Sequence, residues 1–184
     1  RMNQKLMNRY PSIADLRLRA LERIPHFAWE YLDSGTGADV CMRRNREALD
    51  AVTMVPHFMK GVFQPILSTR LFGVFYDVPF GVSPVGLTGL MWPRAERILA
   101  VSAGKHRHPY TLSTAATEAP ETIGPLADGM GWFQLYPPRS AQIRRDLIER
   151  ARDSGFTTLM VTADVPIASR RERQVKAGVV VPPK

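Results

Sequence analysis

The sequence is poor in cysteine and has no long apolar run. Cys41 is the single cysteine among 184 residues, which excludes an internal disulfide framework and favours a reducing compartment. No apolar stretch approaches the roughly 20 residues that a membrane-spanning helix needs. Residues 1–9 lack the apolar core of a secretory signal, so we expect none. With 45% hydrophobic and 23% charged residues, the composition is that of a globular protein.

Acidic residues are fewer than basic residues in this sequence. Lys and Arg outnumber Asp and Glu by 25 to 17, which gives a formal net charge of +8 and favours an anionic partner. Nucleic acid, a membrane surface and a small acid all fit this charge. The basic residues, including the run at 170–176, show no aromatic interleaving and no zinc-finger or helix-turn-helix pattern, so we expect no nucleic-acid partner. The simpler alternative is that the chain is a basic fragment and that the acidic residues which balance its charge lie in residues not present here.

The first part of the chain predicts helices followed by loops. Ser12 is the expected N-cap of a helix that Pro25 ends. Its apolar face is formed by Ile13, Leu16, Leu18 and Leu21. Two further helices are predicted over residues 27–32 and 40–49. Prolines and a glycine interrupt residues 53–75, which predicts loops and short strands there.

The second part has a regular repeat of apolar strands and amphipathic helices. Strands are predicted over residues 79–84, 109–113, 132–136 and 158–162, and helices over residues 92–105, 119–127 and 141–154. Strands that alternate with helices in this way indicate an α/β fold with a parallel sheet. We therefore expect helices and loops over residues 1–77 and the start of a β/α domain over residues 78–184.

Polar residues follow each predicted strand. The four segments are Ser83-Pro-Val-Gly86, Leu112-Ser-Thr114, Gln134-Leu-Tyr136 and Thr162-Ala-Asp164. The carboxyl ends of parallel strands meet at one rim, so these side chains should lie together. Taken alone, Ser113 and Thr162 are equally well explained as strand-end hydroxyls bonded to local backbone. Gln134 stands between two apolar residues, where burial without a partner would be costly.

These segments, with Tyr31-Leu-Asp-Ser-Gly35, Asn45-Arg46 and Arg171-Glu-Arg173, resemble a known enzyme family. It is the FMN-dependent L-2-hydroxy acid dehydrogenases and oxidases, which include glycolate oxidase, lactate oxidase, flavocytochrome b2 and mandelate dehydrogenase. The resemblance spans about residues 12–183 and is closest to the mandelate dehydrogenase branch. It implies a (β/α)8 TIM barrel, of which this chain gives the N-terminal helical segment and about the first four β/α units. A complete barrel of this kind has roughly 250 residues.

The resemblance implies FMN as the cofactor, lying across the barrel mouth. The backbone of Pro84, Val85 and Gly86 would lie beside the reactive N5 edge of the flavin. Three side chains, Ser113, Gln134 and Thr162, would hydrogen-bond its polar atoms, since an apolar ring system needs a few well-placed donors and acceptors to fix its orientation. Val85 departs mildly from the threonine that relatives often have. A glycine at position 86 is often associated with dehydrogenases, which favours a quinone or other carrier over oxygen.

Substrate binding falls, by the same resemblance, to Tyr31, Tyr136 and Arg171. A guanidinium can pair with the planar carboxylate of a 2-hydroxy acid through two parallel hydrogen bonds, the role implied for Arg171. Tyr31 would assist it, and Tyr136 would take a catalytic position near the substrate hydroxyl and the flavin. Without the resemblance, Arg171 would be a solvated residue of a basic run and Tyr31 a helix residue packing its ring. Asp164 is expected to be structural.

The implied reaction oxidises an L-2-hydroxy acid, such as lactate or mandelate, to the 2-oxo acid. A histidine base takes the proton, and two electrons pass to FMN and then to a quinone, another carrier or oxygen. The four histidines of this chain, His26, His57, His106 and His108, match no such position. The base, a lysine near the flavin N1 region, a second arginine and the phosphate site are therefore expected in the second half of the barrel.

Half a barrel exposes an unpaired strand edge, so we expect the missing C-terminal half to be a partner of this chain. Either the polypeptide is nicked or disordered after the fourth strand, which we favour because the break falls in a loop, or it is truncated. The resemblance also implies a homotetramer. It places the protein in the cytoplasm or peripherally on the cytoplasmic face of the inner membrane. Two alternatives stay open: another flavin- or phosphate-binding barrel, such as a relative of isopentenyl-diphosphate isomerase or inosine-monophosphate dehydrogenase, and an inactive binding fragment with a basic surface.

Overall fold

A computed structural model of the chain describes residues 4–163 and 169–179. The chain forms two compact units. One combines residues 1–56 with residues 167–184, and the other comprises residues 57–166. The predicted division at residue 77 concerns the complete barrel and stays a prediction.

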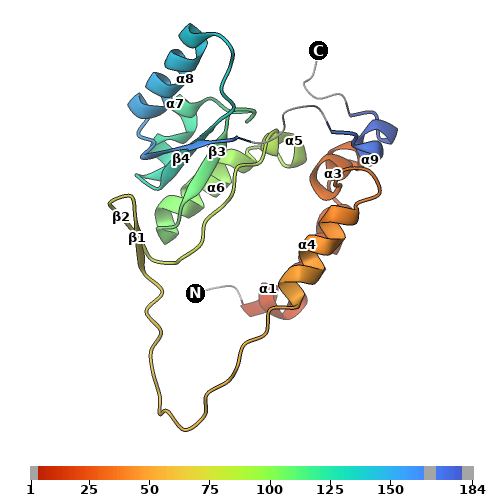
Figure 1. The fold of residues 1–184 in the computed structure, drawn as a ribbon, viewed down its shortest axis with the longest axis vertical. Coiled ribbons are helices and arrows are strands. Elements are labelled where there is room, and N and C mark those ends of the chain that lie inside the picture. Colours follow the sequence, from red (N-terminus) through yellow and green to blue (C-terminus); the bar gives the residue numbers. More distant parts are fainter. Residues whose placement is uncertain (1–3, 164–168, 180–184) are drawn as a thin grey trace. The chain divides into compact units, whose positions relative to one another are not determined.

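The unit that contains the two ends of the chain is helical (Figure 1). Its helices are α1 (Gln4–Arg9), α2 (Ile13–Leu21), α3 (His26–Asp33), α4 (Val40–Asp50) and α9 (Glu172–Lys176). The predicted helices over residues 27–32 and 40–49 are confirmed by α3 and α4. The short helix α9 comes from far along the sequence and packs against α3.

The N-cap of α2 is the one expected from the sequence. Ser12 Oγ accepts a hydrogen bond from the Asp15 N–H (3.2 Å), and Asp15 Oδ2 accepts one from the Ser12 N–H (2.9 Å). This reciprocal pair is a capping box. The predicted stop is wrong, because α2 ends at Leu21 and Pro25 instead stands at the N-cap of α3. The apolar face of α2 is exposed among the described residues, with Ile13 80% exposed.

The second unit contains the strands. An antiparallel hairpin of β1 (Thr69–Leu71) and β2 (Val74–Tyr76) precedes a parallel sheet in the order β3 (Tyr110–Ser113), β4 (Gly131–Leu135) and β5 (Thr158–Val161). Its helices are α5 (Thr88–Met91), α6 (Ala95–His106), α7 (Pro120–Ile123), the 3-10 turn η1 (Pro125–Ala127) and α8 (Ala141–Asp153). The α/β prediction is confirmed, and so are the strands over residues 109–113, 132–136 and 158–162 to within two residues at each end.

The predicted strand over residues 79–84 forms only in part. A single parallel bridge joins Val82 to Tyr110, with the Val82 N–H bonded to the Pro109 carbonyl (2.8 Å). Prolines at positions 79 and 84 have no N–H to donate to a ladder, which limits the pairing to this bridge. Gly81 permits the close approach, since a Cβ there would lie 2.6 Å from the Pro109 carbonyl oxygen.

The helix predicted over residues 92–105 forms as α6, which begins at Ala95, whereas the helix predicted over residues 119–127 is split in two. Pro93 lies between the end of α5 at Met91 and the start of α6. The segment predicted over residues 119–127 divides into α7 and η1 at Gly124. Proline cannot continue a helix from the preceding turn, which accounts for both breaks.

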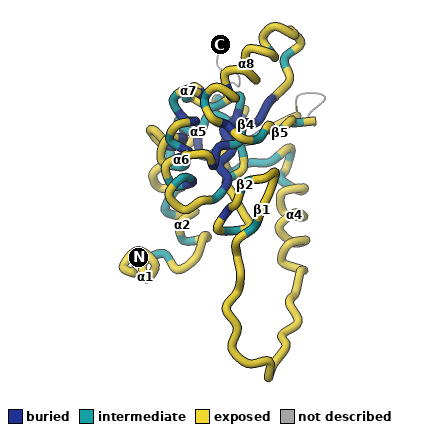
Figure 2. Tube along the Cα trace, turned by 90° about the vertical axis from the view of Figure 1, so that its left-hand side faces the viewer, coloured by how far each residue is buried: buried dark blue, intermediate teal, exposed yellow. Residues whose placement is uncertain are grey.

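The core of this unit lies between the sheet and the helices that cover one of its faces. The most deeply buried apolar residues come from β3, β4 and the helices α6, α7 and η1, and include Leu112, Phe133, Ala100, Ile123 and Ala127. Figure 2 shows this burial concentrated in the sheet and the adjoining helices. Leu159 and Val161 of the edge strand β5 are 43% and 54% exposed. β5 is the last strand in the order of the sheet, and no described strand pairs with its outer edge.

Candidate active site

Three polar side chains meet at the carboxyl ends of neighbouring strands. Ser113 ends β3, Gln134 lies one residue before the end of β4, and Thr162 directly follows β5. Ser113 and Gln134 are partners in the parallel register. Because strand side chains alternate between faces, these residues project from the face of the sheet opposite to the Leu112 and Phe133 core.

The three side chains form one chain of hydrogen bonds. Ser113 Oγ donates to Gln134 Oε1 (3.0 Å), and Gln134 Nε2 donates to Thr162 Oγ1 (2.7 Å). Gln134 is 1% exposed and Ser113 is 5% exposed. A buried amide with this many partners is held in one orientation. The structure thus brings together all three side chains that were predicted to contact the cofactor.

Thr114 belongs to the same network although sequence reasoning did not single it out. Its N–H donates to Gln134 Oε1 (3.3 Å), and its hydroxyl donates to the Gln134 carbonyl oxygen (2.5 Å). The Thr114 hydroxyl oxygen also accepts from the Tyr136 N–H (3.1 Å). A second hydroxyl directly after a strand-end serine was the signal available in the sequence. We call Ser113, Thr114, Gln134 and Thr162 the Gln134 network.

Tyr136 directly follows β4, so its backbone is fixed by the Gln134 network. Its side chain is 49% exposed. Tyr136 is therefore half-exposed next to the end of β4, while its main chain is bonded to Thr114. This is the arrangement that the prediction for Tyr136 requires of a side chain that meets a bound molecule.

The loop at residues 83–88 is fixed by backbone contacts to the neighbouring strand end. Pro84, Val85 and Gly86 are half-buried. The Thr88 hydroxyl donates to the Val85 carbonyl (2.7 Å), and the Leu87 N–H donates to the Ala115 carbonyl (2.8 Å). Leu87 has φ of +55°, a left-handed conformation that a bulky side chain seldom adopts. Such conformations persist where surrounding contacts enforce them, and they concentrate at functional sites.

Glu96 is a buried carboxyl that sequence reasoning missed, because an acid in an amphipathic helix is typical of a solvated face. It is 0% exposed. Its Oε1 accepts three hydrogen bonds, from the Gly89 N–H (3.0 Å), the Thr117 N–H (3.0 Å) and the Thr117 hydroxyl (2.7 Å). Its Oε2 is buried and has no hydrogen-bond partner among the described residues. Glu96 thereby joins α5, which follows the loop at residues 83–88, to the loop after β3.

The same carboxyl acts on Tyr110 at the start of β3. Burial raises the pKa of the Tyr110 phenol well above its ordinary value, and the nearby Glu96 charge raises it further. Tyr110 is therefore a neutral core residue.

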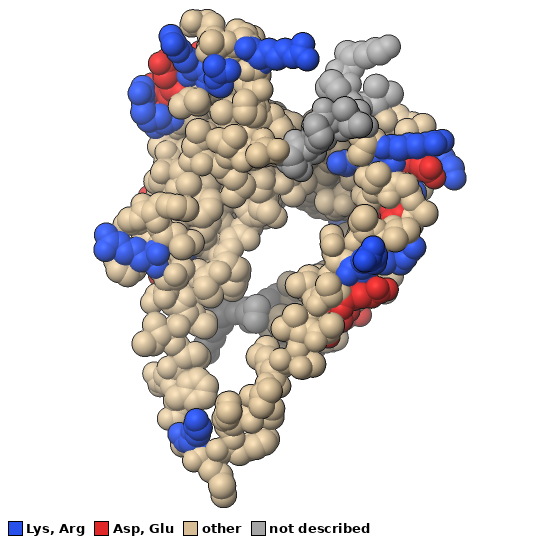
Figure 3. Space-filling view, viewed as in Figure 1, with Lys and Arg blue, Asp and Glu red and all other residues tan. Residues whose placement is uncertain are grey.

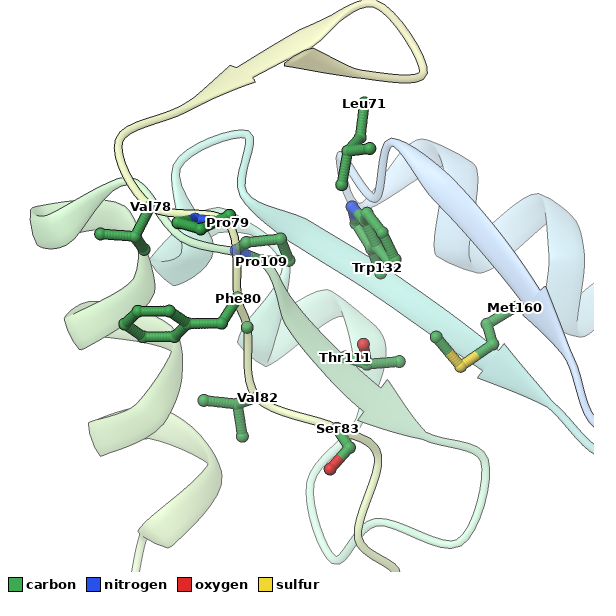
Figure 4. A pocket seen from close by; sticks show the side chains of 11 residues that line it. Leu71, Val78, Pro79, Phe80, Val82, Ser83, Pro109, Thr111, Trp132 and Met160 are labelled. Atoms are coloured by element: carbon green, nitrogen blue, oxygen red, sulfur yellow. The ribbon is translucent and has the colours of Figure 1, made fainter. Parts of the chain in front are cut away.

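An apolar cavity lies on the sheet face that carries the Gln134 network. Thr111, Trp132 and Met160 line it, and each precedes a network residue by two positions (Figure 4). The cavity has a volume of about 230 Å³. The Trp132 indole donates to the Tyr76 hydroxyl (2.8 Å), which fixes the hairpin against this side of β4. An apolar layer beneath a polar rim is the arrangement found inside β/α barrels.

A family model described as FMN-dependent dehydrogenase matches residues 20–184. The chain belongs to the FMN-dependent dehydrogenase family. The family expected from the strand-end motifs is therefore confirmed.

Curated relatives and solved structures agree with this assignment. The L-lactate dehydrogenase of Pseudomonas paraeruginosa is 36% identical over 168 residues, which are 91% of this chain and 44% of that protein. The L-lactate dehydrogenase of Xanthomonas campestris pv. campestris is 35% identical over 169 residues, 92% of this chain and 44% of that protein. A crystal structure of mandelate oxidase matches with a TM-score of 0.88 at 31% identity, covering 94% of this chain and 50% of that chain. A chimera of (S)-mandelate dehydrogenase matches with a TM-score of 0.86 at 30% identity, covering 93% and 48%.

The chain thus spans about half the length of the relatives that it matches. Within this half, the structure shows three parallel strands and their helices rather than a closed barrel. The coarse α/β class is established, and the (β/α)8 barrel stays a proposal for the whole protein.

The two remaining residues predicted to bind substrate lie in the helical unit. Tyr31 is on α3 and is half-buried, whereas Arg171 stands directly before α9 and is exposed. The Arg171 guanidinium donates a long hydrogen bond to Ser169 Oγ (3.5 Å). A side chain joins the two segments, since Gln174 Nε2 donates to the Tyr31 carbonyl (3.3 Å). Asp164, expected to be structural, lies outside the described residues.

The family's expected histidine base has no candidate in the described part of the chain. His26, His57 and His106 are exposed. His108 is half-buried, with its Nδ1 3.1 Å from the Pro109 carbonyl oxygen at the amino-terminal side of β3. The Gln134 network lies at the opposite end of that strand, so His108 does not share its rim.

Residues 4–163 and 169–179 contain no group of three or more His, Cys, Asp or Glu side chains that could hold a metal ion. No helix in the same ranges is long and apolar enough to span a bilayer. Arg side chains do gather on the surface of α8, among acidic residues of the same helix, as Figure 3 shows.

Proposed function

We propose that this chain supplies the first half of a (β/α)8 barrel that oxidises an L-2-hydroxy acid to the 2-oxo acid with FMN as cofactor. The observation that carries the proposal is the Gln134 network, three neighbouring strand ends whose side chains are joined by hydrogen bonds. Enzymes with β/α barrels build their active sites at this end of the strands. Membership of the FMN-dependent dehydrogenase family and the lactate and mandelate enzymes among the relatives support the same reaction class.

The donors and acceptors of the network suit an isoalloxazine ring. Gln134 Oε1 receives the Ser113 and Thr114 donors, so the amide nitrogen is directed towards Thr162. That nitrogen carries a second hydrogen, and the Thr162 hydroxyl accepts from Gln134 while keeping its own hydrogen to donate. A flavin edge offers carbonyl oxygens and a ring N–H that can pair with such groups. When bound, the flavin would supply the two-electron acceptor for the substrate.

The loop of Pro84, Val85 and Gly86 would contribute backbone rather than side chains to the flavin's N5 edge. Its conformation is set by Thr88, by the Leu87 contact to Ala115 and by Glu96 through Gly89. A backbone wall needs such external support, because it has no side chain of its own to anchor it. Gly86 favours electron transfer onward to a quinone or another carrier, which is part of the proposal.

Tyr31, Tyr136 and Arg171 would bind the hydroxy acid. Arg171 would pair with the carboxylate, and its exposed, lightly bonded guanidinium suits that role. Tyr31 would add a hydrogen bond to the same carboxylate. The Tyr136 hydroxyl would contact the substrate hydroxyl and so help to orient the bond that is oxidised. The histidine that takes the proton would come from the second half of the barrel, and a homotetramer is the expected assembly.

The test is an anaerobic titration of the purified protein, combined with the second half of the barrel where the preparation lacks it. We expect a flavin absorbance band that bleaches with L-lactate or L-mandelate. In the variant Arg171→Met, KM should rise about 100-fold, because a bidentate charge-assisted pair is lost. Arg170→Met removes a neighbouring exposed arginine and should leave KM within about twofold. A complete protein that binds no flavin would refute the proposal.

A further inference from the structure

Two arginines of the same short segment have opposite surroundings. Arg171 is exposed, whereas the Arg173 side chain is 33% exposed and bonded to three carboxylates. Their positions differ by two residues, and α9 begins between them. Because the three carboxylates around the Arg173 guanidinium would repel a further anion, Arg173 is suited to a purpose other than substrate binding.

The contacts of Arg173 use all sides of its guanidinium. Nε donates to Glu30 Oε2 (2.6 Å), Nη1 to Asp39 Oδ2 (2.8 Å) and Nη2 to Asp33 Oδ2 (3.3 Å). Nη1 also donates to the Asp33 carbonyl oxygen (3.3 Å). The three carboxylates are only 13%, 13% and 14% exposed. We call Glu30, Asp33, Asp39 and Arg173 the Arg173 cluster.

The carboxylates are themselves held in place. Asp39 Oδ1 accepts from the Gly35 N–H (2.7 Å), and Asp33 accepts two hydrogen bonds from Arg17 (2.8 Å each). Asp39 has φ of +59° directly before α4. A single guanidinium therefore joins α9 to α3 and to the start of α4, at points that are fixed independently of it.

The backbone on either side of Arg171 is tied to the same region. The Gly37 N–H donates to the Arg170 carbonyl (2.8 Å), and Gln174, which is 5% exposed, donates to the Tyr31 carbonyl. Arg171 thus lies between two attachments to this region, the Arg170 carbonyl and the Gln174 side chain, with the Arg173 cluster beside the second one. Figure 1 shows α9 lying along α3, the helix that carries Tyr31.

We infer that Arg173 is a positioning residue that holds Arg171 in register with Tyr31, so that both side chains meet one substrate carboxylate. The inference rests on the proposed function, which gives Tyr31 and Arg171 that carboxylate. Without the cluster, α9 would be held less firmly against α3, and the Arg171 side chain would occupy many positions. Carboxylate binding would weaken in the ground state and in the transition state alike, so KM would change more than kcat.

The test compares Arg173→Ala, Arg173→Lys and Glu30→Gln with the control Arg170→Ala, using L-lactate and L-mandelate. We expect Arg173→Ala to raise KM by about 10- to 100-fold with kcat within about threefold, as for a misplaced binding group. Arg173→Lys should recover part of the loss, because one ammonium can reach one carboxylate but not three. Glu30→Gln keeps the fold of the cluster and should raise KM severalfold. Arg170→Ala should match the wild type, since its side chain is 87% exposed.

Two results would overturn the inference in an active protein. One is a KM for Arg173→Ala and Glu30→Gln equal to that of the control. The other is a parallel loss of kcat, bound flavin and folding without a separate change in KM, which marks a purely structural residue. Hydrogen exchange at the Gly37 and Val175 amides measures how firmly this segment is held, and the measurement does not require activity. It therefore tests the inference separately from the proposed function. If the wild type turns over neither acid, the proposed function fails, and unchanged exchange in Arg173→Ala then refutes the positioning role as well.

Discussion

Gln134 is 1% exposed and uncharged, whereas Arg173 is 33% exposed and meets three carboxylates. Both side chains join segments that are far apart in the sequence, but water contributes differently to each. Removing a buried partner leaves dry donors and acceptors unpaired, which costs the full desolvation of those groups. Arg173 is itself one-third exposed, so water can replace part of its contacts, although the three carboxylates are only 13–14% exposed and would be solvated incompletely. Because it is buried, the Gln134 network should contribute mainly to the stability of the fold. The Arg173 cluster, which contacts several segments at once, should act mainly by holding α9 and Arg171 in place.

A substitution of Gln134 is expected to have the largest effect on stability and on FMN affinity. Gln134→Leu keeps the size of the side chain but leaves the Ser113 hydroxyl without its acceptor and Thr162 without its donor. We expect the free energy of unfolding to fall by about 1–3 kcal/mol, and FMN affinity to fall at least about tenfold through the lost amide contacts. Urea unfolding and the flavin content of the purified protein measure the two effects.

The matched control is Gln142→Leu, which makes the same chemical change at an exposed position on α8. It should alter the unfolding free energy by no more than about 0.5 kcal/mol. Equal effects of the two variants would mean that the Gln134 network does not stabilise the strand ends.

A smaller effect is expected at Glu96, which is as buried as Gln134 but leaves one oxygen without a partner. Glu96→Ala removes the acceptor of the Gly89 and Thr117 donors, so the unfolding free energy should fall by about 1–3 kcal/mol. The gain from no longer burying a half-satisfied carboxyl offsets part of that loss, which places the result below that of Gln134→Leu. The loop at residues 83–88 would loosen, and the absorbance maximum of the bound flavin should shift.

Glu118→Ala is the control for Glu96, because Glu118 pairs with Arg97 at the surface. It should leave the flavin spectrum unchanged and have a smaller effect on unfolding. If Glu96→Ala left both the spectrum and the stability as in the control, the loop would be fixed by other contacts.

Features with a local signal could be predicted from the sequence, whereas features that depend on distant contacts could not. Parallel strands and the Ser12 cap were predictable, because period and capping chemistry are local signals. The convergence of Ser113, Gln134 and Thr162 followed from strand-end geometry. Glu96 and Arg173 were not predictable from local pattern, since each resembles a solvated charge until residues 7 to 143 positions away along the chain are brought beside it. The strand over residues 79–84 was overestimated, because its prolines limit pairing to one bridge.

The smallest effect concerns acid stability and belongs to the Arg173 cluster. The hydrogen bond from Arg173, with a further one from the Gly35 N–H, lowers the pKa of Asp39 below its ordinary value. A carboxyl whose folded pKa is depressed adds stability above its unfolded pKa, and this contribution disappears as the pH falls through the folded pKa. Asp39→Asn removes the titrating group, so thermal stability should decline less steeply below about pH 4 than in the wild type. Asp50→Asn removes a carboxyl whose pKa is lowered by one exposed arginine on the same helix. The melting temperatures of the two variants are compared between neutral pH and about pH 3. If Asp50→Asn changed the acid dependence of the melting temperature as much as Asp39→Asn, the Arg173 cluster would behave as an ordinary surface ion pair.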